Sequence, residues 1–196
     1  MLSTKKQNLF HREDLFTNGK HNHETAQAAT LTLAVTAILA AAGFSPSASA
    51  ELTSREASIV PIAAFTANGN QEQLKKALAK GLDNGLTVNE IKAVLEQMYA
   101  YTGFPRSLTA LGVYVKLLDE LKAAGLKDTV GREPTPLPQG TDLFQIGTKT
   151  QTELVGYPVA GPVYTFSPNI DTYLKDHLFG AIFANDVLNR RERELA

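Results

Sequence analysis

The sequence predicts an all-α protein. Threonine and asparagine residues stand three positions before glutamates, apolar residues recur at spacings of three and four, and glycines follow these stretches. These patterns are typical of the start, the buried face and the end of a helix. The chain has 196 residues, 43% hydrophobic and 20% charged, which is enough for a core of ordinary globular size.

Charge and residue types exclude several classes of function. The chain has 19 Lys and Arg against 20 Asp and Glu, so it has no basic excess to neutralise phosphates and we expect no nucleic-acid partner. It contains no cysteine, which excludes disulfides, thiolate metal sites and cysteine nucleophiles. His11, His21 and His23 have no carboxylate or cysteine at a ligand spacing, so we expect neither a metal nor another cofactor.

Residues 1–50 read as a signal peptide or leader. The segment 25–50 has no charged residue, its apolar run 30–44 is shorter than the roughly 20 residues that span a bilayer, and Ala48 and Ala50 form an A-x-A pattern. We expect cleavage after Ala50, export to the periplasm or medium, and no stable membrane span afterwards. A spanning helix is the alternative, and the long charged segment before the run is unusual for a leader.

The first helices are predicted from caps and terminators. Thr53 to Glu56 forms a capping box for a helix that ends at Asn68, with Pro61 expected to kink it or break its first turn. A second helix is expected over 71–84, ended by Gly85 in a left-handed conformation.

A second capping box, Thr87 to Glu90, predicts a helix to about residue 102 that Gly103 and Pro105 end. The next helix is expected over 105–125, ended by Gly125. Its predicted buried stripe is Leu108, Leu111, Val115, Leu118 and Leu121.

Residues 126–167 are rich in proline and glycine and are predicted to be a connector. A short helix is expected over 143–154, and Val163 to Phe166 could be extended. Ser167 and Pro168 open a last full helix that ends near Asn185. Its expected core face is Ile170, Tyr173, Leu174, His177 or Leu178, and Ile182.

One stretch carries a family resemblance. Asn84-Gly85, the segment Thr87-x-x-Glu90-Ile91 and the segment Tyr101-x-Gly103-x-Pro105 follow one another without a gap, in the pattern of the carboxymuconolactone decarboxylase family. The resemblance implies an alkylhydroperoxidase-D-like helical bundle over residues 51–125. It also implies a homo-oligomer, a trimer or hexamer.

The chain repeats part of this pattern near its end. Residues 188–192 (LNRRE) echo residues 52–56 (LTSRE), and residues 177–183 resemble the segment that precedes the opening helix in family members. We therefore expect one complete repeat and, over 168–196, the beginning of a truncated second one. A frayed natural C-terminus is the alternative.

The resemblance implies a lyase acting on small carboxylates or lactones, but with altered chemistry. Ala77 stands where the decarboxylases have a histidine, and Ala93 replaces the second glutamate of their E-I-x-E motif. The peroxidase relatives use a C-x-x-C pair, which this chain lacks. The expected proton donor is therefore missing from the complete repeat.

The remaining polar residues supply the candidate site. Expected catalytic residues are Glu90, Tyr101 and Arg106, and expected substrate-binding residues are Gln97, Thr102 and His177. Each also has a structural interpretation: Glu90 completes a capping box, Tyr101 and His177 suit a core or an interface, and Arg106 suits a solvated surface.

Three functions follow from these residues. The first is an exported decarboxylase-like enzyme for a small carboxylate or lactone. The second is a repeat that assembles an oligomer without catalysis, and the third is a small-molecule binding module.

Overall fold

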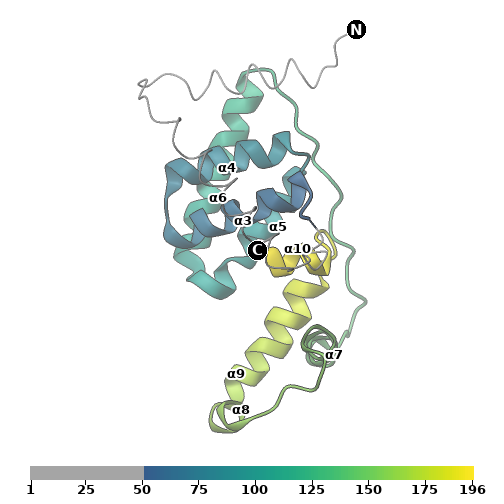
Figure 1. Cartoon of the computed structure of the whole chain (residues 1–196). Coiled ribbons are helices and arrows are strands. Elements are labelled where there is room, and N and C mark those ends of the chain that lie inside the picture. Colours follow the sequence, from purple (N-terminus) through teal and green to yellow (C-terminus); the bar gives the residue numbers. More distant parts are fainter. Residues whose placement is uncertain (1–50) are drawn as a thin grey trace, which may run out of the picture. The chain divides into compact units, whose positions relative to one another are not determined.

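The computed structural model describes residues 51–196, so the predicted leader lies outside the described residues. Residues 54–196 form one compact unit. Within 51–196 every regular element is helical and no strand occurs (Figure 1). The predicted all-α fold is confirmed. None of the helices in this range is long and apolar enough to cross a membrane.

The first two helices form a hairpin. Helix α3 (Ser54–Asn68) begins directly after Thr53 and continues through Pro61, so the expected break does not occur. Helix α4 (Gln71–Asp83) is capped by the Asn70 side chain, which accepts from the Gln73 N–H. Gly85 follows it with φ +94°, the left-handed conformation predicted for the terminator.

Helices α5 (Val88–Gln97) and α6 (Tyr99–Ala123) form a second hairpin. Both hydrogen bonds of the predicted capping box are present, from the Glu90 N–H to Thr87 and from the Thr87 N–H to Glu90. Gly103 has φ +80° and ψ 160°, which breaks α6 into two helical pieces at the predicted place. The core between the two hairpins is aliphatic, and its largest fully buried side chains include Ile59, Ile62, Leu74, Leu78, Ile91, Leu95, Leu117 and Leu121.

The buried face of α6 differs from the predicted one. The helix buries Ser107, Ala110, Tyr114, Leu117 and Leu121, of which only Leu121 belongs to the predicted stripe. The polar groups of this face find partners inside the core, because the Ser107 hydroxyl donates to the Leu95 carbonyl and the Tyr114 hydroxyl donates to the Val88 carbonyl. Leu108 and Val115 are consequently 63% and 58% exposed.

An irregular segment leads from α6 to the C-terminal part. It is tied to the start of α5, where the Val88 and Asn89 N–H groups donate to the carbonyls of Thr129 and Val130. These are N–H groups that a first helical turn leaves unsatisfied, so the connector supplies acceptors that the helix itself lacks.

The C-terminal part begins with a close pair of helices. Helix α7 (Leu143–Val155), the short helices α8 (Pro162–Phe166) and α9 (Pro168–Thr172), and the π-helix η1 (Tyr173–Ile182) follow one another. A Cβ at Gly147 would lie 1.6 Å from the Lys175 carbonyl oxygen, so only glycine allows α7 to approach η1 this closely.

Two predictions for this part are wrong. The segment Val163 to Phe166 is helical rather than extended, because Pro162 opens a helical turn and no strand of the described chain lies beside it. The helix expected from Pro168 to near Asn185 is present as α9 continuing directly into η1, but two members of its expected core face, Ile170 and Tyr173, are exposed.

The last helix, α10 (Arg190–Leu195), returns to the first hairpin and packs on α3 (Figure 1). Its capping box is complete: the Glu192 N–H donates to the Asn189 side chain, and the Asn189 N–H donates to Glu192. The six-residue helix is too short to be stable alone, so its packing partners hold it in place.

Candidate functional site

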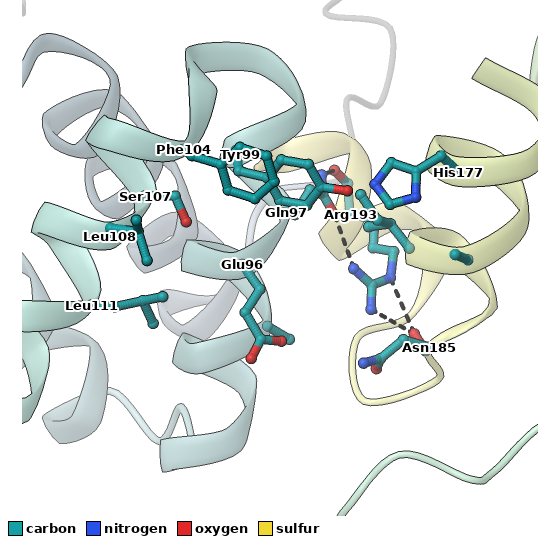
Figure 2. Close-up of a pocket in the computed structure, with 13 residues that line it drawn as sticks. Glu96, Gln97, Tyr99, Phe104, Ser107, Leu108, Leu111, His177, Asn185 and Arg193 are labelled. Atoms are coloured by element: carbon teal, nitrogen blue, oxygen red, sulfur yellow. Dashed lines mark hydrogen bonds between the residues drawn. The ribbon is translucent and has the colours of Figure 1, made fainter. Parts of the chain in front are cut away.

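A cavity of about 360 Å³ lies between α5, α6, η1 and α10 (Figure 2). Its volume is in the range of small-molecule sites. Most of the wall is apolar, and a few polar side chains from different helices point into it. The lining residues are Ala93, Glu96, Gln97, Tyr99, Phe104, Ser107, Leu108, Leu111, His177, Ala181, Ile182, Asn185 and Arg193.

An aromatic wall forms one side of this cavity. The rings of Tyr99 and Phe104 are stacked with centroids 4.6 Å apart, and the imidazole of His177 lies 5.3 Å from the Tyr99 ring. Tyr99 and Phe104 come from α6, whereas His177 comes from η1. This wall suits the flat face of a small unsaturated or cyclic molecule.

Arg193 brings a buried cation to the cavity. The residue is 2% exposed, and its guanidinium donates from Nη1 to the Gln97 side chain and from Nε and Nη2 to the Asn185 carbonyl. Within residues 51–196 no carboxylate oxygen lies within 4.0 Å of it, and burial lowers its pKa to about 10. The three bonds use three of five N–H donors, so two remain for an anionic ligand.

Glu96 brings a carboxyl group to the cavity. The residue is exposed overall, but it lines the cavity, and desolvation of its carboxyl group raises its pKa despite the opposing charges of Lys92 and Arg193. A carboxyl group with a raised pKa can carry a proton nearer to neutral pH than an ordinary glutamate. A cation and a proton-exchanging group therefore line the same cavity.

Two of the six candidate residues from the sequence line the cavity. Gln97 is buried and binds Arg193 through both of its polar atoms, because its Nε2 also donates to the Arg193 carbonyl. His177 stands in the aromatic wall. Both positions are compatible with substrate binding.

The other four candidates lie outside it. Glu90 forms a bidentate ion pair with Arg55, and its pKa is lowered because the hydrogen bonds from Arg55 and Thr87 outweigh its desolvation. The Arg106 guanidinium packs against Gly69. Tyr101 is 56% exposed, and the Thr102 hydroxyl donates to the Met98 carbonyl of its own helix.

The two replaced family positions lie in different places. Ala93 lines the cavity, and Glu96, one helical turn later, lines it too. Ala77 lines a separate hollow of about 380 Å³ between α3 and α4, together with Lys80 and Asn84. Ala93, where the resemblance implies a glutamate, thus lies near the carboxyl group of Glu96. Ala77, where it implies a histidine, does not line this cavity.

A family model matches part of the chain. Residues 30–116 match the model of the carboxymuconolactone decarboxylase family. No curated protein matches the chain. Among the described residues, no group of three or more His, Asp and Glu could hold a metal ion.

The carboxymuconolactone decarboxylase segment contains only part of the cavity. Its match ends within α6, so it includes Ala93 and Glu96 but neither His177 nor Arg193. Arg193 was missed in the sequence analysis. It directly follows the LNRRE echo at residues 188–192, which is the one sequence signal that could have drawn attention to it.

The raised pKa of Glu96 predicts a pH-dependent effect of the substitution Glu96→Gln. When the pKa of a carboxyl group is higher in the folded chain than in the unfolded chain, its protonated form stabilises the fold. This stabilisation is present below the ordinary pKa of 4.5 and is lost as the pH rises through the pKa of the folded chain. Glutamine cannot ionise. The free energy of unfolding of the variant, relative to the unsubstituted chain, should therefore increase between about pH 4.5 and pH 7 in urea titrations.

Glu72→Gln is the matched control, because the exposed Glu72 has its pKa lowered by Lys76. The stability that Glu72 contributes is lost only as the pH falls below about 4.5, so Glu72→Gln should show little pH-dependent difference from the unsubstituted chain between pH 4.5 and pH 7. A pH-independent difference between the Glu96→Gln and unsubstituted chains would contradict the raised pKa.

Proposed function

We propose that this protein binds a small organic carboxylate in the cavity between α5, α6, η1 and α10, as a decarboxylase-like member of the carboxymuconolactone decarboxylase family. The observation that carries the proposal is the guanidinium of Arg193, which is buried in the cavity wall without a carboxylate partner in residues 51–196. A buried cation of this kind is costly unless an anion compensates it. A bound carboxylate would do so.

Decarboxylation requires two groups that this cavity combines. Loss of carbon dioxide leaves a carbanion or enolate, which a cation stabilises and an acid protonates. Arg193 is suited to hold the oxyanion, and Glu96 is suited to deliver the proton. The family also includes alkylhydroperoxidase-like relatives, but a thiol peroxidase reaction needs cysteine, which the sequence lacks.

Arg193→Met should weaken binding of benzoate by at least about tenfold, because a charge-assisted hydrogen-bonded pair is lost while the side-chain stem remains. The affinity is measured by isothermal titration calorimetry at constant ionic strength. Benzamide, which has the same ring but no charge, should bind the unsubstituted chain weakly and respond little to Arg193→Met.

The matched control is Arg106→Met, which removes a guanidinium that packs on Gly69, outside the cavity. It should leave the benzoate affinity unchanged. Equal losses in the two variants, or equal affinities for benzoate and benzamide, would refute carboxylate binding at Arg193.

We also propose that the chain forms a homo-oligomer, with an exposed apolar stripe on α6 as the contact surface. Phe104, Leu108 and Val115 are all more than half exposed and recur at helical spacing, roughly a third of a turn from the buried face. Exposed apolar side chains that line up along a helix favour association. An assembly role without catalysis is the second candidate function.

Val115→Glu should shift the sedimentation coefficient towards that of a monomer, because a charge in an apolar contact is strongly unfavourable. Thr109→Glu adds the same charge on another exposed face of α6 and should leave the assembly intact. A monomeric unsubstituted chain would count against this proposal, whatever the variants do.

Export is proposed from the sequence of the leader. The apolar run 30–44 and the A-x-A pattern at Ala48 and Ala50 support cleavage after Ala50. The family match begins at residue 30, so cleavage would remove its first part. N-terminal sequencing of protein recovered outside the cytoplasm should begin at Glu51, and a start well before Glu51 would argue for an uncleaved segment.

A further inference from the structure

Two similar dipeptides meet where α10 packs on α3. In both helices an arginine directly precedes a glutamate: Arg55-Glu56 in α3 and Arg191-Glu192 in α10. The arginine of each helix binds the glutamate of the other, with Arg55 Nη2 2.7 Å from Glu192 Oε1 and Arg191 Nε 2.7 Å from Glu56 Oε1. We call this reciprocal arrangement the α3–α10 clamp.

Arg55 extends the α3–α10 clamp to α5. Its Nη1 and Nη2 lie 2.8 and 2.7 Å from the two carboxylate oxygens of Glu90. Glu90 and Glu192 each complete the capping box of their helix. One guanidinium therefore joins the N-terminal caps of α5 and α10, where negative side chains also interact favourably with the helix dipoles.

The same short helix carries Arg193 into the cavity. Arg193 directly follows Glu192, and it binds Gln97 at the other end of α5. Helix α10 is therefore linked to both ends of α5. Arg55 links Glu192 to Glu90 at the first end, and Arg193 binds Gln97 at the second. Because six residues cannot keep a helical position alone, the orientation of the Arg193 guanidinium depends on these contacts.

We propose that Arg55 and Arg191 are positioning residues for the carboxylate site: the α3–α10 clamp holds α10 so that Arg193 faces the cavity. Neither residue lines the cavity. The inference rests on the proposed carboxylate binding, since it assigns the control of that same site. Only the chain with α10 in place binds the ligand well, so loosening α10 lowers the apparent affinity in proportion to the population that remains docked.

The test compares benzoate affinity and amide hydrogen exchange in the full chain. Arg55→Met should lower the affinity about tenfold or more and accelerate exchange of the α10 amides. Arg191→Met removes the more exposed pair and should lower the affinity about threefold. Arg191→Lys keeps the charge beside Glu56 and should restore most of that loss.

Lys75→Met is the control, because it breaks an ion pair with Glu120 between α4 and α6, away from α10. It should change neither the benzoate affinity nor the exchange of α10, even where it lowers the melting temperature. If Arg55→Met and Arg191→Met bind benzoate as the unsubstituted chain does, the positioning role is overturned while carboxylate binding stands. If the unsubstituted chain binds no benzoate, or Arg193→Met binds it equally well, both proposals fail.

Discussion

Short helices in this protein depend on the polar groups at their ends. Helix α10 has six residues and α5 has ten, so neither gains enough from its own hydrogen bonds to persist alone. Each has a complete capping box, and one guanidinium, that of Arg55, binds the capping glutamates of both. The groups that satisfy the helix ends therefore also join the C-terminal helix to the first hairpins. The same carboxylate groups thus cap a helix and form contacts between helices.

The local nature of helix caps explains how much of the fold the sequence predicts. Caps and terminators act over three or four residues, so the capping box at Thr87 and the left-handed glycine at position 85 are visible in the sequence and appear in the structure. The break at Gly103 is equally local. The all-helical fold and most helix boundaries follow from such signals. The predicted domain limits and the truncated second repeat depend on more than local signals, and they remain predictions.

The buried face of α6 and the site depend on distant partners. Leu108 looks like a core residue by periodicity, but the face with Ser107 and Tyr114 is buried instead, and backbone carbonyls of α5 accept hydrogen bonds from these two hydroxyl groups. The close approach of α7 to η1 depends on where Gly147 meets a carbonyl oxygen of another helix. Arg193 reaches the cavity through contacts with Gln97, 96 residues earlier in the chain. In each of these contacts the two partners are distant in the sequence, and neither residue indicates which partner it will meet.

Replacement of family residues by alanine does not by itself remove the chemistry of a site. Ala93 abolishes one carboxyl group, yet Glu96 brings another to the same cavity from the next turn of α5. A proton donor is defined by its distance to the reacting atom and by its pKa, and both can be conserved when the position in the sequence is not. Ala77, by contrast, lines a hollow that Arg193 does not reach. Alanine at position 77 therefore bears on the α3–α4 hollow, whereas Glu96 is the proton donor that we propose for the Arg193 cavity.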